Sequence, residues 1–107
     1  HHLSEFEKSH AFRRGLFNDG WYRYTGLWMG PPLMCYLGKN VGENVNNYYC
    51  TATAKKEIID TDLNGNVVDN YNKTYDIFFI TSKPLESGYG KPVKVLDIQC
   101  KNLRISR

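Results

Sequence analysis

The side chains that could perform chemistry are scattered along this sequence of 107 residues. The three histidines are His1, His2 and His10, and the eleven carboxylates form no obvious facing pair. Glycoside hydrolysis needs two carboxylates across a cleft, and general base catalysis needs a side chain such as histidine close to the proton it removes. The sequence therefore predicts no catalytic residue and no enzyme. A small secreted toxin or hydrolase is the alternative class, without residues to assign to it.

The three cysteines, Cys35, Cys50 and Cys100, allow one disulfide and one leftover thiol. No spacing between them resembles the CxxC pattern of zinc sites, and we predict no metal site and no cofactor. The alternating patterns around Cys50 and Cys100 turn both inward, which favours a bridge between these two, and Cys35–Cys50 is the alternative. A Cys50–Cys100 bridge closes a long loop and stabilises the fold by about 4 kcal/mol. The leftover thiol could join two chains into a homodimer.

One short segment begins like a calcium-binding loop. Asp60, Asp62 and Asn64 place oxygens at positions one, three and five, and Gly65 follows at position six. Position twelve is Tyr71, where such a loop needs a bidentate glutamate. A hairpin tip with polar turn residues is the favoured interpretation, and a weak calcium site is the alternative.

Aromatic residues are the compositional outlier, with fifteen among 107 residues, eight of them tyrosine. A domain of this size cannot bury all of them, and exposed tyrosine and tryptophan are typical of binding surfaces. The alternative is that half of the rings pack under the helix and the rest are dispersed. The predicted binding residues are Trp21, Tyr22, Tyr24, Trp28 and Tyr89.

Composition and charge restrict the class of partner and the compartment. The net charge of +3 comes from dispersed basic residues, so we predict no nucleic-acid partner. No run of eighteen apolar residues exists, so no membrane span is expected. The cysteine count and the Asn, Gly and Tyr content favour a secreted protein. The triplet Asn72-Lys73-Thr74 makes Asn72 a candidate glycosylation site.

The chain is long enough for one domain, 1–107, which opens with one helix over 4–14. Ser4 and Glu7 are spaced as a capping box, in which each side chain satisfies an exposed amide at the start of the helix. Gly15 is the expected left-handed stop.

Strands are expected from residue 21 to residue 105. The alternation over 48–60 places Cys50, Ala52 and Ala54 on one face. Asn64-Gly65 favours a type I′ hairpin, which would pair Ile58-Ile59 with Val67-Val68. The segment 74–81 is expected to be buried at three consecutive residues, Phe78, Phe79 and Ile80. In the last strand, 93–105, the apolar phase shifts between Val95 and Leu96, which indicates a bulge.

These elements predict a mainly β fold, a small antiparallel β-sandwich or partly closed barrel with one N-terminal helix. The predicted function is that of a secreted, non-enzymatic binding protein that engages an extracellular protein or glycan through exposed aromatic residues. The alternative is a carrier of a small lipid or amine in an aromatic-lined pocket, which requires an enclosed apolar cavity.

Overall fold

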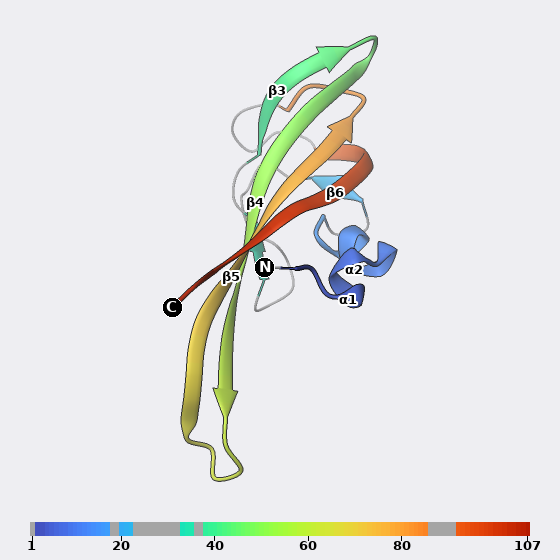
Figure 1. The fold of residues 1–107 in the computed structure, drawn as a ribbon. Coiled ribbons are helices and arrows are strands. Elements are labelled where there is room, and N and C mark those ends of the chain that lie inside the picture. Colours follow the sequence, from blue (N-terminus) through green and yellow to red (C-terminus); the bar gives the residue numbers. More distant parts are fainter. Residues whose placement is uncertain (1, 18–19, 23–32, 36–37, 86–91) are drawn as a thin grey trace.

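The computed structural model describes residues 2–17, 20–22, 33–35, 38–85 and 92–107. Two short helices come first, followed by strands that occupy most of the described chain (Figure 1). Their bounds are α1 Glu5–Lys8, α2 His10–Gly15, β1 Trp21–Tyr22, β2 Leu33–Cys35, β3 Lys39–Asn44, β4 Asn47–Thr61, β5 Val67–Thr81 and β6 Val93–Ser106. No helix among the described residues is long and apolar enough to cross a membrane.

The strands form one open antiparallel sheet in the order β1-β6-β5-β4-β2, with β3 pairing to β4 farther along the same edge. The prediction of a mainly β, antiparallel fold is confirmed. The sheet does not close, so the predicted barrel is wrong, and the described strands supply no second layer for a sandwich. Instead, the two helices lie against one face of the sheet (Figure 1).

The single helix predicted over 4–14 is interrupted at Ser9. Ser9 has an extended backbone (φ −70°, ψ 154°), like Ser4 at the start of α1 (φ −70°, ψ 166°). The Ser9 hydroxyl accepts a hydrogen bond from the Phe12 amide, so Ser9 caps a new helix. The predicted capping box is confirmed: the Ser4 hydroxyl accepts from the Glu7 amide and the Glu7 carboxylate accepts from the Ser4 amide. Gly15 is the last residue of α2 and has no positive φ, and the C-cap residue Leu16 has right-handed helical geometry. Gly15 is therefore not the predicted left-handed stop.

The core lies between the helices and the inner face of the sheet. Cys50, Ala52 and Ala54 of β4 are buried, as the alternation predicted. On β5 the buried residues also alternate, and Phe78 and Ile80 are only partly buried. The prediction of three consecutive buried residues is therefore wrong, because neither of the described helices lies against the outer face of β5. The inner face of β5 consists of Tyr75, Ile77, Phe79 and Thr81.

Aromatic contacts join the helical segment to the sheet. The Phe12 ring lies 5.3 Å from that of Tyr75, and the Phe17 ring lies 4.7 Å from that of Phe79. Tyr22 packs against both Phe17 and Phe79, at 5.5 and 5.4 Å. Such offset and edge-on ring pairs add to the stabilisation from burial. They fix the helices on the inner face of β5.

The β4–β5 turn differs from the predicted type I′ turn. Only Gly65 has a positive φ (84°), and its amide donates to the Asp62 carbonyl. This pattern is a type I turn followed by a left-handed glycine, a common longer hairpin loop. The Asp62 carboxylate accepts hydrogen bonds from the Asn64 and Asn66 amides and stabilises this form. The predicted pairing of Ile58-Ile59 with Val67-Val68 is wrong: Ile58 pairs with Tyr71 and Ile59 with Asn70, and the longer loop changes the pairing only next to the tip, at the irregularity between Asp60 and Thr61.

A two-residue turn with two positive φ angles does occur, between β3 and β4. Val45 (φ 34°) and Asn46 (φ 66°) form it. The sequence predicts no turn at this pair, and valine is rarely found at positive φ. The bulge predicted in the last strand is confirmed: Ile80 pairs with Asp97 and Thr81 with Val95, so Leu96 is the additional residue.

Candidate functional site

The structure places two of the five predicted aromatic binding residues, and they differ in exposure. Trp21 is 42% exposed on the edge strand β1, where a partner could reach it. Tyr22 is 3% exposed and belongs to the core, because successive side chains of a strand point to opposite faces. The assignment of Tyr22 to a binding surface is therefore wrong. Tyr24, Trp28 and Tyr89 lie outside the described residues.

The predicted Cys50–Cys100 disulfide is absent, and both residues are free thiols. Both do face inward, but β5 lies between them: Cys50 pairs with Phe79, and Cys100 pairs with Ile77. Two strand spacings separate their backbones by about 10 Å, beyond the roughly 7 Å limit for a disulfide. The alternation of side chains along each strand predicted correctly that both cysteines face inward, but it could not predict the order of the strands in the sheet.

Both thiols are also poor nucleophiles. Burial raises the pKa of the Cys50 thiol, which donates to the Asn40 side-chain oxygen at 3.3 Å. Burial raises the pKa of the Cys100 thiol to about 11. Reactive cysteines need a lowered pKa, so neither thiol has the environment of a catalytic nucleophile.

The remaining predicted positions lie on or next to the β4–β5 hairpin. Asn72, the candidate glycosylation site, lies within the β5 ladder between Glu57 and Ser106 and is partly buried. The Asp62 carboxylate, the middle oxygen of the calcium-like segment, is engaged by backbone amides, and these hydrogen bonds hold its pKa below the usual range. Both Asn72 and Asp62 belong to the β4–β5 hairpin.

The outer half of the β4–β5 hairpin extends beyond the rest of the sheet as a two-stranded arm, which we define as residues 57–71. Strand β2 pairs with β4 only as far as Lys56, and β6 pairs with β5 only as far as Asn72. Figure 1 shows the arm projecting alone, and it makes the molecule 54 Å long against 28 and 22 Å across. An isolated two-stranded ribbon is marginally stable in water, so its length calls for a functional explanation.

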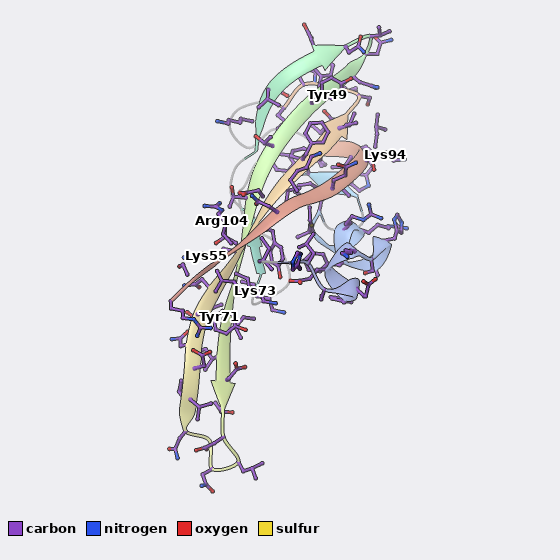
Figure 2. All side chains as sticks on the ribbon, viewed as in Figure 1. Tyr49, Lys55, Tyr71, Lys73, Lys94 and Arg104 are labelled. Atoms are coloured by element: carbon purple, nitrogen blue, oxygen red, sulfur yellow. The ribbon has the colours of Figure 1, made fainter. Side chains whose placement is uncertain are left out.

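Aliphatic side chains on the arm are exposed to solvent. Four of them are more than half exposed, and Figure 2 shows the side chains of the arm standing clear of the helices. They are Ile59 at 52%, Leu63 at 106%, Val67 at 60% and Val68 at 64%. Scattered exposed aliphatics are normal on a protein surface, but a group on one projecting element is typical of an interaction site.

The arm is also acidic. Residues 57–71 contain four carboxylates and no lysine or arginine, so the arm carries a charge of −4. The other 92 residues hold all fourteen basic and the other seven acidic side chains, and carry +7. The segregation of charge makes the arm a local negative surface on a chain of net positive charge, so the attraction of a basic partner surface is confined to the arm.

The register of the arm brings two of these carboxylates together. Asp60 pairs directly with Asp69, and like charges at such positions destabilise a hairpin. Arg107 compensates in part: its Nη1 lies 2.7 Å from both Asp69 oxygens, which lowers the pKa of that carboxyl group. Within the described chain, Asp60 makes no ion pair of its own, and the charge of Arg107 acts on it only at longer range. A basic partner would relieve this repulsion.

A second exposed feature lies on the sheet face that faces away from the helices. The rings of Tyr49 and Phe78 stack at 5.9 Å, and the Lys101 ammonium lies 5.5 Å from the centre of the Phe78 ring. Phe78 and Lys101 line an open groove of about 450 Å³, which Lys39 also lines. Figure 2 shows Tyr49 on the upper part of the sheet, far from the arm. This aromatic surface was not among the predicted site residues.

The sequence of the arm differs from that of a strand pair with one buried face. The fifteen residues 57–71 hold four acids, no base and several aliphatics around one turn. In the sequence, the alternation predicted over 48–60 continues only to Ala54, because three charged residues follow in a row at 55–57. Its loss beyond that residue indicates a ribbon that leaves the core.

Comparison of this chain with protein-family models, with characterised proteins and with solved structures finds no match. The function is therefore argued from the geometry of the described residues.

Proposed function

We propose that this is a non-enzymatic binding protein whose arm, residues 57–71, docks on a protein partner. The observation that carries the proposal is the arm itself, an acidic two-stranded ribbon with four exposed aliphatics and no third strand beside it in the described chain. The chemistry of the arm specifies the partner surface, an apolar patch bordered by lysine and arginine. A glycan partner, also expected from the aromatic content, fits an aliphatic and acidic arm less well.

The energetics of the arm support a docking role. Its exposed aliphatics gain about 25 cal/mol for each Å² of apolar surface that a partner removes from water. No described strand pairs with the outer edges of the arm, and these edges offer backbone groups to an added strand. The carboxylates contribute mainly to the association rate and to specificity.

The test is capture from extracellular fluid with three immobilised baits: the wild-type chain, the arm variant Ile59→Thr/Leu63→Ser, and the body variant Trp21→Ala. We expect a protein that the wild-type and Trp21→Ala baits retain and the arm variant does not. After purification, that protein should bind the arm variant at least tenfold more weakly. Its affinity for wild type should fall with added salt, because steering by the carboxylates is screened.

Two results would contradict the proposal. One is that the arm variant retains every protein that the wild type retains. The other is that Trp21→Ala abolishes capture and the arm variant does not, which would return the binding surface to the aromatic residues predicted from the sequence. Leu63 is fully exposed and Ile59 half-exposed, so the arm substitutions remove little packing from the core.

Secretion and glycosylation of Asn72 belong to the same proposal. Because Cys50 and Cys100 form no disulfide, the proposal of secretion is based on the composition of the chain, and that of glycosylation on the Asn72-Lys73-Thr74 triplet. Expression through a secretory pathway, followed by enzymatic removal of N-glycans, tests both. A mass shift that Asn72→Gln eliminates is expected, and a secreted chain without a glycan would remove Asn72 from the proposal.

A further inference from the structure

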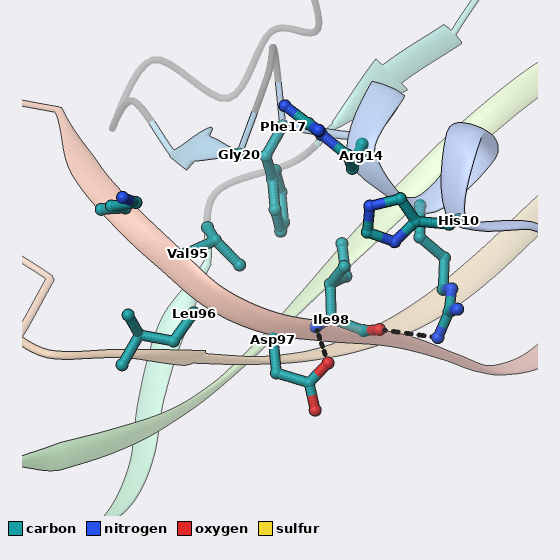
Figure 3. A pocket seen from close by; sticks show the side chains of 10 residues that line it. His10, Arg14, Phe17, Gly20, Val95, Leu96, Asp97 and Ile98 are labelled. Carbon is teal, nitrogen blue, oxygen red and sulfur yellow. Dashed lines mark hydrogen bonds between the residues drawn. The ribbon is translucent and has the colours of Figure 1, made fainter.

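A cleft of about 270 Å³ lies between α2 and β6 (Figure 3). Its apolar surface comes from Phe17, Val95 and Ile98. Phe17 is fixed by its contacts with Tyr22 and Phe79, and so this part of the cleft is rigid. The volume is at the lower end for ligand sites, which are usually about 300–1,000 Å³.

The helical wall of the cleft is basic. Arg13 and Arg14 follow His10 by three and four residues, a spacing that places each of them near His10 on the helix surface. Lys94 adds a fourth basic group from β6. None of the four takes part in an ion pair with a described residue.

The one acidic residue that borders the cleft does not neutralise this charge. The Asp97 carboxylate accepts a hydrogen bond from the Ile98 amide, and Figure 3 shows it on the opposite side of the β6 ribbon from His10. Arg13 donates from Nη1 to the Ile98 carbonyl at 3.4 Å, and its buried Nε has no hydrogen-bond partner. The cleft therefore combines an apolar floor with a surplus of donors and positive charge.

We infer that this cleft binds a small amphipathic anion, a carboxylate with a short alkyl or aryl body. The body would lie on Phe17 and Val95, and the carboxylate would accept hydrogen bonds from Arg14 and Lys94 at the rim. Arginine and ammonium groups form strong charge-assisted hydrogen bonds with carboxylates. The same charges exclude an amine, one of the ligands expected from the sequence.

Calorimetric titration of the full chain tests the inference with four probes. Octanoate is expected to bind, octylammonium has the same tail with the opposite charge, acetate lacks the tail, and sulfate supplies charge alone. We expect octanoate to bind at least tenfold more tightly than each of the other three. Equal binding of octanoate and octylammonium would overturn the inference, as would no binding of octanoate.

Matched charge variants locate the site. Arg14→Glu/Lys94→Glu reverses two exposed rim charges and should weaken octanoate binding at least tenfold. The control variant Lys39→Glu/Lys101→Glu reverses two exposed charges at the groove on the other face of the sheet. It should change the affinity for octanoate less than twofold. The opposite ranking would overturn the inference. The arm variant Ile59→Thr/Leu63→Ser should bind octanoate as the wild type does, so this result is independent of the proposed protein-binding role.

Discussion

The Glu7 carboxylate accepts a hydrogen bond from the Tyr75 hydroxyl, and this contact joins the first turn of the chain to the central strand. Glu7 is 5% and Tyr75 1% exposed. The same carboxylate completes the capping box with Ser4 and lies 3.5 Å from the Lys73 ammonium. One side chain thus begins α1 and attaches it to β5.

Tyr75→Phe should destabilise the protein by about 1–3 kcal/mol, because it leaves a buried carboxylate short of a hydrogen-bond donor. Urea denaturation of Tyr75→Phe, Glu7→Gln and the double variant measures the free energies of unfolding. The two single effects should be non-additive, because the residues share one interaction. Additive effects would show that the contact contributes nothing to stability.

The contribution of Glu7 should depend on pH. Burial raises the pKa of Glu7. Hydrogen bonds with the Ser4 amide, the Tyr75 hydroxyl and the Ser4 hydroxyl, together with the Lys73 charge, lower it by more than burial raises it. The net pKa of Glu7 therefore lies below the ordinary value of 4.5. A group with a lowered folded-state pKa stabilises the fold above its unfolded-state pKa and loses this effect as the pH falls through the folded-state value. The stability difference between wild type and Glu7→Gln should be constant near neutrality and should shrink below about pH 4.5. A difference that grows on acidification would contradict this assignment.

Both described thiols should be free in the purified protein. Alkylation in denaturant without reductant should modify Cys50 and Cys100 quantitatively, as peptide mass spectrometry can show. In the native state both should react slowly, because burial raises their pKa values, that of Cys100 to about 11. A disulfide-linked pair of peptides that contain Cys50 and Cys100 would contradict the structure.

Val45→Asn should stabilise the protein by about 1 kcal/mol, because a β-branched residue at positive φ is strained and asparagine tolerates that region. Val45 is 84% exposed, so the substitution loses little packing. The expected rise in Tm is about 4–8 °C. Val41→Asn is the control: Val41 is also exposed, but its φ is not positive, and its Tm should not rise. Equal shifts would assign the gain to the loss of exposed apolar surface.

Backbone amides in the arm should exchange with solvent faster than those of the body. Hydrogen exchange followed by NMR should find the lowest protection over 57–71, where the ribbon has no third strand in the described chain, and the highest over 74–81, where β5 lies between β4 and β6. Binding of the proposed partner should protect the arm selectively. Uniform protection along β5 would indicate that the arm is already packed in solution.

The sequence by itself determined the features that depend on neighbouring residues. The Ser4–Glu7 capping box, the burial of alternate residues from Cys50 to Ala54 and the bulge at Leu96 all follow from local spacing, because one strand or helix turn is enough to define them. The break at Ser9 was within reach of the same reasoning, since serine prefers a helix cap to a helix interior.

Only the tertiary structure decided which strands became neighbours. Alternation turned Cys50 and Cys100 inward, but it could not show that β5 separates them, because strand order depends on packing between segments far apart in the chain. The same cause governs the arm: the acidic composition of residues 57–71 is visible in the sequence, but their exposure follows from where β2 and β6 end. Tyr22 joined the core for the same reason, since its partners Phe17 and Phe79 meet it only in the folded chain.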